Sequence, residues 1–476
     1  MLNLELCSMK SKLFIDSNIV SGFDKPIIFY LVNNNDTTNF FITFALLDFN
    51  KKEISYLFSY SDENIECVKN HPNNEMFNIF KVPHCAISIE QNKELLVFMQ
   101  EEEFFLHINI EKNILTVYTI NDLLKDNTIE YKKITSTLFK DNIDENYFYL
   151  SVVDENNIIH IFRISLKLDE IEEIYSLIGK SDPPHVLKKY KNFLLLSHEF
   201  NDAKFKLTKT DKVVNSEELA MIFQRNKMRL KMIDNDTDIN DANIDLLRNK
   251  LLHDLKDKYL IDCVNGKVIL LNLDSKDVKY YTTSGGSPAH FEIDEQSNTI
   301  YISSHNFFNR KDSMTFIKPA VLDKFILEND EMILLKSFTY EKGYRFASHR
   351  VFRYNNKIYI CTIAHPNRIM FIDAENMELL FYEDIEDDEL SNINNDLDIY
   401  LSTRKNKFQI VPIEVSANGE NIIFMSNEHI YIYNFPKRIV TAKLEYKQSS
   451  INANDFNNKL SLNNYRLQAV HINYID

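Results

Sequence analysis

The chain has 476 residues, of which 44% are hydrophobic, so it can bury a large core without disulfides. Its 70 acidic side chains outnumber the 54 basic ones, and the net charge of −16 disfavours nucleic acid and anionic membrane as partners. We expect a cytoplasmic protein with no signal peptide and no membrane span, because the first residues lack a basic region, no long apolar run occurs, and the five cysteines are scattered without a CxxC pair.

Short runs of Ile, Phe, Tyr and Val, separated by Asn, Asp and Lys, fill most of the chain. Residues 95–98, 147–150, 300–302 and 358–360 are typical of these runs. Runs this short, rich in aromatic and β-branched residues, predict β-strands rather than helices.

One unit of strands recurs along the chain. Residues 82–120 and 411–444 share the same order of apolar runs and turns, and each begins with a valine and a proline, Pro83 and Pro412. Four short strands per unit, repeated roughly every 40 to 60 residues, are typical of a propeller blade. The sequence therefore predicts one all-β domain over 1–476, a β-propeller of about seven four-stranded blades.

The predicted units begin near residues 12, 84, 133, 185, 290, 349 and 412. A last strand over 469–473 is expected to close the ring against the first blade, which leaves few free sheet edges.

Residues 215–256 interrupt the strand pattern. Asn215 and Glu218 match a capping box, and apolar residues recur at helical spacing over 244–255. We predict a helical insertion in the fourth blade, which could cover one face of the ring as a lid.

The histidines follow the repeat. One set opens the first strand of a unit: His84, His185, His290 and His349. A second set ends the following strand: His198, His305 and His365. Antiparallel pairing places the start of one strand beside the end of the next, so both sets are expected at one rim of the ring. Since the first strand of each blade lines the axis, the opening histidines are expected to converge there.

Converging neutral imidazoles suit a metal ion such as iron, copper or zinc. We predict that the four opening histidines bind the metal, and that the outer histidines, Glu414 and Glu199 orient the ligating rings. The glycine pair Gly285-Gly286, just before His290, indicates a close backbone approach or a tight bend. Two alternatives remain: a structural ring of histidines that bond carbonyls of neighbouring strands, and a metal-free substrate pocket.

A seven-bladed propeller with four axial histidines from inner strands resembles the carotenoid cleavage oxygenases, and segments 287–291 and 346–350 loosely match their motifs. The resemblance implies Fe(II) held by His84, His185, His290 and His349, and O2-dependent cleavage of an alkene bond in a small apolar or aromatic substrate. The chain is also similar to other propellers with histidine-rich axes, such as the selenium-binding protein family.

Two functions from different classes follow. One is a metal-dependent oxygenase whose 215–256 insertion limits the access of water. The other is a non-enzymatic propeller that presents loops to a protein partner. The fold itself does not choose between them. The chain contains no GxSxG, P-loop, GxGxxG or HExxH motif, which excludes the common hydrolase, nucleotide-binding and zinc-protease sites.

Overall fold

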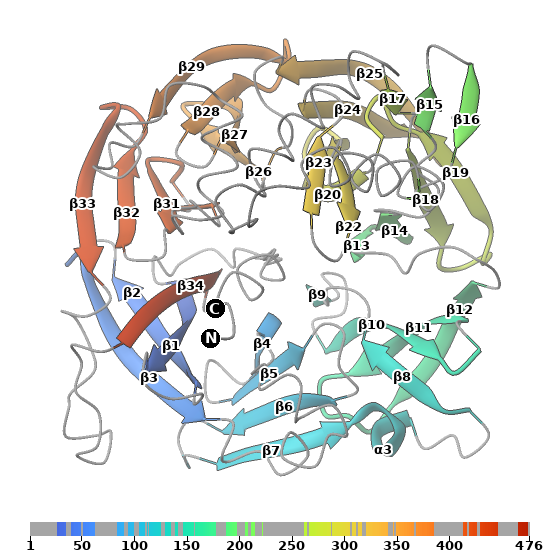
Figure 1. The fold of residues 1–476 in the computed structure, drawn as a ribbon, viewed down its shortest axis with the longest axis vertical. Helices are drawn as coiled ribbons and strands as arrows, with labels where there is room; N and C mark the ends of the chain where they lie inside the picture. Colours follow the sequence, from blue (N-terminus) through green and yellow to red (C-terminus); the bar gives the residue numbers. More distant parts are fainter. Residues whose placement is uncertain are drawn as a thin grey trace, which may run out of the picture.

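Antiparallel β-sheets arranged in a ring around a central axis make up the computed structural model of the protein (Figure 1). The structure describes residues 26–34, 40–48, 51–61, 83–89, 94–99, 104–109, 112, 114–124, 129–134, 139–140, 146–156, 158–177, 187–197, 205–207, 211–214, 221, 261–263, 266–286, 288–304, 307–310, 313–316, 320–340, 346, 349–365, 368–384, 413–416, 418–425, 429–445 and 465–474.

The sheets of the described ring are called blades 1 to 7 in chain order. Blade 1 consists of β34 (Tyr465–Tyr474), β1 (Pro26–Asn34), β2 (Phe40–Asp48) and β3 (Glu53–Ser61). Blade 2 consists of β4 (Pro83–Ile89), β5 (Glu94–Met99), β6 (Phe104–Asn109) and β7 (Ile114–Thr119). Blade 3 consists of β8 (Tyr131–Ile134), β9 (Phe139–Lys140), β10 (Tyr147–Asp154), β11 (Ile159–Ser165) and β12 (Ile171–Leu177). A short helix, α3 (Ile120–Leu124), connects blades 2 and 3.

The other blades each have four strands. Blade 4 consists of β13 (Leu187–Tyr190), β14 (Phe193–Ser197), β18 (Lys267–Asn272) and β19 (Val278–Thr282). Blade 5 consists of β20 (Pro288–Asp294), β21 (Thr299–Ser304), β24 (Ala320–Glu328) and β25 (Glu331–Tyr340). Blade 6 consists of β26 (His349–Tyr354), β27 (Lys357–His365), β28 (Arg368–Asp373) and β29 (Glu378–Asp384). Blade 7 consists of β30 (Ile413–Val415), β31 (Asn421–Met425), β32 (His429–Asn434) and β33 (Ile439–Glu445).

Strands from the two ends of the ring close it. β34 pairs antiparallel with β1, with Ile27 opposite Asn473 and Ile28 opposite Ile472. This pairing confirms the predicted closing strand, which makes β34 the innermost strand of blade 1 (Figure 1).

The all-β propeller predicted from the sequence is confirmed. β4, β20 and β26 open their blades at Pro83, Pro288 and His349, close to the predicted starts. The number of blades in the whole chain stays a prediction, because long stretches lie outside the described residues. In the part of the chain that is described, no helix is long and apolar enough to cross a membrane.

The predicted helical insertion lies almost wholly outside the described residues. Its surroundings are described: β15 (Phe205–Leu207) and β16 (Lys212–Val214) precede it, and β17 (Ile261–Cys263) follows it. These strands form a small separate sheet between the second and third strands of blade 4. A hairpin of β22 (Phe307–Arg310) and β23 (Ser313–Phe316) occupies the same place in blade 5.

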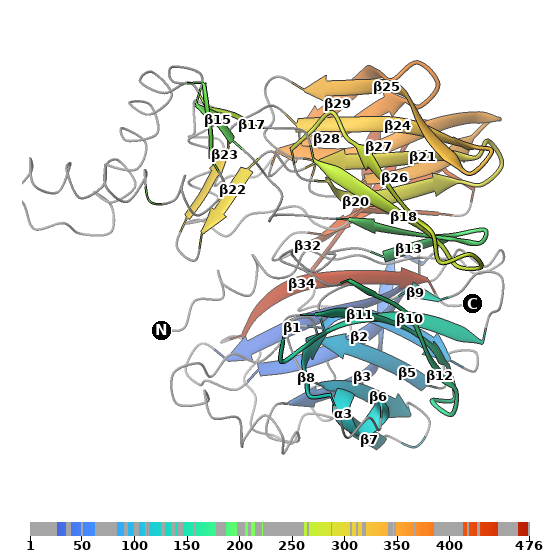
Figure 2. The same cartoon turned by 90° about the vertical axis from the view of Figure 1, so that its right-hand side faces the viewer.

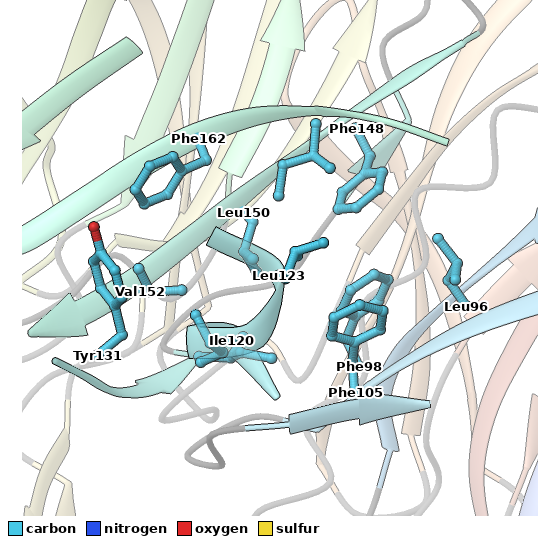
Figure 3. Packing of buried hydrophobic residues seen from close by; sticks show 12 residues of the cluster. Leu96, Phe98, Phe105, Ile120, Leu123, Tyr131, Phe148, Leu150, Val152 and Phe162 are labelled. Atoms are coloured by element: carbon cyan, nitrogen blue, oxygen red, sulfur yellow. The ribbon is translucent and has the colours of Figure 1, made fainter. Parts of the chain in front are cut away.

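The hydrophobic core lies between neighbouring blades. Figure 3 shows one such cluster, in which Phe98 and Phe105 of blade 2 pack with Phe148 of blade 3 and with α3. Because both faces of the middle strands are covered, β14 and β21 are buried along their whole length. Burying each large apolar side chain contributes about 1.5–3 kcal/mol, so the seams between blades supply most of the stability.

Residues other than glycine take the left-handed conformation in the turns between third and fourth strands. Lys276, Met377 and Arg438 have φ of 62°, 54° and 52°. The side chain of the residue before the turn stabilises it by accepting hydrogen bonds from the turn's backbone. In blade 4, Asn272 Oδ1 accepts hydrogen bonds from the backbone N–H groups of Asp274 and Ser275. This side-chain capping explains how a chain with seven glycines makes so many turns.

Candidate functional site at the inner strands

The structure describes two of the four predicted metal ligands in full. His290 lies in β20 and His349 opens β26, and each side chain is 1% exposed. His84 in β4, His365 at the end of β27 and Glu414 in β30 have described backbones but no described side chains. The remaining predicted site residues lie outside the described residues: His185, His198, Glu199 and His305.

His349 is bonded to the neighbouring blade. Its Nε2 lies 3.2 Å from the carbonyl oxygen of Tyr301 in β21. A carbonyl can only accept, so we assign the proton to Nε2, and the neutral ring then carries a lone pair on Nδ1. Burial, reinforced by the Arg350 guanidinium, lowers the pKa of His349 to about 3. His349 is therefore neutral at physiological pH and makes the carbonyl bond that the structural alternative predicts.

His290 and His349 face the same seam from opposite sides. Side chains alternate along a strand, and Asp294, which shares the face of His290, accepts hydrogen bonds from Arg353 of β26. Arg353 in turn shares the face of His349. The two imidazoles therefore lie on opposite walls of the seam between blades 5 and 6.

The described residues alone do not form a complete metal-binding site. Among them, no group of three or more His, Cys, Asp or Glu side chains is close enough to hold a metal. His290 and His349 supply two of the four predicted ligands, and the side chains of His84 and His185 are not described. The four-histidine metal site therefore stays a prediction.

A chain of charges links the inner strands of blades 4, 5 and 6. Glu292 of β20 places Oε1 3.2 Å from Nη1 of Arg350 in β26 and 4.0 Å from Nζ of Lys188 in β13. The Arg350 side chain is 5% exposed. A buried cation is tolerated where a carboxylate offsets the cost of removing it from water. Sequence reasoning missed this chain of charges, although all three residues lie in the first strand of their blades.

The glycine pair before His290 has a structural role. Gly285 accepts a hydrogen bond from the backbone N–H of Gly266, at 2.7 Å. A Cβ added to Gly266 would lie 2.4 Å from Cδ of Pro288 and 2.7 Å from the carbonyl oxygen of Gly286. The close approach in this region is therefore made at Gly266, which lies against Pro288 and the backbone of Gly286.

Asp323 is a buried carboxylate near the same seam of blades 4 and 5. Its oxygens accept hydrogen bonds from the backbone N–H of Ser284, at 2.7 Å, and from the hydroxyl of Ser337, at 2.6 Å. Burial raises the pKa of Asp323 despite these bonds. The charged form is thus costly in the folded protein.

The pH dependence of stability should change in Asp323→Asn. A raised pKa in the folded state means that the wild type loses stability as the pH rises through the ordinary value of 3.8 toward the folded-state value. Asparagine can keep both hydrogen bonds without ionising. We expect the free energy of unfolding of the wild type, relative to Asp323→Asn, to fall between these two pKa values and then level off, as measured by urea unfolding from pH 3.5 to 8. A difference that is constant with pH would contradict the prediction.

Comparisons with known proteins give the fold little independent support. No family model and no curated protein matches the chain. Among solved structures, the WD40 β-propeller domain of Doa1 is similar to it with 9% identity and a TM-score of 0.40, over 75% of this chain and 79% of that one. A similarity this low carries no argument, so the propeller rests on the sheet order itself. Nothing in the comparisons points to the carotenoid cleavage oxygenases.

Proposed function

We propose that this protein is a non-enzymatic β-propeller scaffold that binds a protein partner through one face of the ring. The observation that supports this function is the pair of small sheets inserted into blades 4 and 5. β15–β17 and β22–β23 both project from the same side of the ring, which we call the loop face (Figure 2). They belong to adjacent blades, so they form one asymmetric feature (Figure 1).

The projecting sheets are not needed to complete the ring. Blades 4 and 5 already have four paired strands each, and in the described strand pairings β15–β17 and β22–β23 pair only among themselves. A two-stranded hairpin is marginally stable by itself, and its open edges can pair with a strand of another protein. Val213 in β16 is 48% exposed, which adds apolar surface there. Such a feature is useful chiefly as a surface for a partner.

The inner strands support a structural role rather than a catalytic one. His349 bonds a carbonyl of blade 5, and the charges of Lys188, Glu292 and Arg350 connect three blades. These contacts hold blades together. These contacts of the described inner strands support the scaffold function.

A variant without the hairpin tests the proposal. Residues 306–319 are replaced by Asn-Gly, a two-residue turn that suits the register in which Ser304 pairs with Val321 and that keeps the core residue Ala320. The matched control is Asp330→Gly, in a left-handed turn between the third and fourth strands, on the opposite face. We expect both variants to fold, and only the first to lose the proteins that co-purify with the wild type from the native cells. An unchanged set of co-purified proteins would contradict the proposal.

The metal prediction has its own test. Iron, copper or zinc on the four opening histidines would appear as about one metal ion per chain in protein purified without a polyhistidine tag. That metal should be lost in the double variant His290→Ala/His349→Ala while the fold is kept. A wild-type protein that neither contains nor takes up metal would remove this prediction.

A further inference from the structure

We propose that the seam between blades 5 and 6 binds one buried water molecule, held between Nδ1 of His349 and Oγ of Ser303. The inference concerns the ring itself and does not depend on the proposed function. It follows from two buried polar atoms without hydrogen-bond partners among the described residues, one on each wall of the seam.

Both side chains point into this seam. Ser303 lies two residues after Tyr301 in β21, so the two share a face. The Tyr301 ring packs with Ile360 and Met370 of blade 6, which shows that this face is turned toward that blade. His349 extends from the opposite wall, where its Nε2 contacts the Tyr301 carbonyl.

The two atoms are buried and have no hydrogen-bond partner within the described part of the chain. Ser303 is 0% exposed, and neither its Oγ nor Nδ1 of His349 is bonded. Each buried polar atom without a partner costs about 1–3 kcal/mol, so native proteins rarely leave such atoms unpaired. Their chemistry is complementary to water: Nδ1 accepts a hydrogen bond, and the serine hydroxyl both donates and accepts.

Other small ligands fit this pair of atoms less well. An anion needs donors, whereas Nδ1 of His349 carries a lone pair. A divalent metal would add charge to a site near the cations of Arg350 and Lys188, both of which already disfavour a charged His349. No third His, Cys, Asp or Glu among the described residues completes a metal site. A neutral molecule that donates and accepts, and that is small enough for a packed seam, is water.

A high-resolution crystal structure of the full chain tests the site without any variant. We expect one water peak within about 3.2 Å of both His349 Nδ1 and Ser303 Oγ. A direct bond between the two side chains, a metal with anomalous scattering, or a dry seam would each overturn the proposal.

Water relaxation dispersion in solution gives a second measurement. In Ser303→Val the added methyl groups should displace the water, and the signal of long-lived buried waters should fall by one molecule. Thr283→Val is the matched control, because the Thr283 hydroxyl already bonds the Gly285 carbonyl at 3.0 Å. An unchanged signal in a folded Ser303→Val protein contradicts the proposal, and if that variant does not fold the crystal structure decides.

Discussion

Replacing Glu292 by alanine is expected to lower the free energy of unfolding by about 3–5 kcal/mol, because it leaves the buried Arg350 cation without its carboxylate. Lys188 loses its contact with the same carboxylate in the same step. The loss should appear in urea unfolding as a lower midpoint with an unchanged slope, since the ring and the surface it exposes on unfolding stay the same.

Two further variants separate charge from shape. Glu292→Gln keeps the size of the side chain and one hydrogen bond to Arg350, so we expect a smaller loss than with alanine. Glu292→Met/Arg350→Met removes both charges and should recover much of the stability, because the buried Arg350 cation is removed together with its carboxylate. A Glu292→Ala protein within about 1 kcal/mol of the wild type would show that the pair behaves like a surface salt bridge.

The Gly419→Ala substitution should be almost as damaging. Gly419 has a φ of +71°, and a Cβ there would lie 2.2 Å from the carbonyl oxygen of Arg353 in β26. The left-handed conformation costs about 1–2 kcal/mol for a residue with a Cβ, and overpacking adds about 1–3 kcal/mol. We therefore expect a loss of about 2–5 kcal/mol in the free energy of unfolding, because the turn of blade 7 can no longer approach blade 6.

Asn329→Ala is the control for the backbone effect. Asn329 also has a positive φ, 50°, in the turn between β24 and β25, and it is exposed. Alanine there should lower the free energy of unfolding by about 1 kcal/mol, since only the left-handed backbone conformation disfavours it. Equal losses in the two variants would contradict the close approach of Gly419 to Arg353.

The architecture was predictable because strand patterns are local. The apolar runs, the opening prolines Pro83 and Pro288, and the closing strand in β34 all depend on residues next to one another in the chain. The middle strand β14, which is buried on both faces, is also visible in the sequence as an unbroken apolar run over 193–196.

The arrangement of the site was less predictable, because it depends on which seam each side chain faces. His290 and His349 occupy similar places in the repeat, yet a register shift between Pro288 and His290 separates their phases. They therefore face one seam from opposite walls. The contact between Glu292 and Arg350 joins residues 58 positions apart, which no local pattern reveals.

Cross-linking of the protein to its co-purified partner, read by mass spectrometry, tests the scaffold function most directly. Lys212 in β16 is exposed on the loop face, whereas Lys276 and Lys357 are exposed in turns on the opposite face. The account predicts cross-links from the partner to Lys212 and few or none to the other two. A partner that cross-links to Lys276 and Lys357 and not to Lys212 would contradict it.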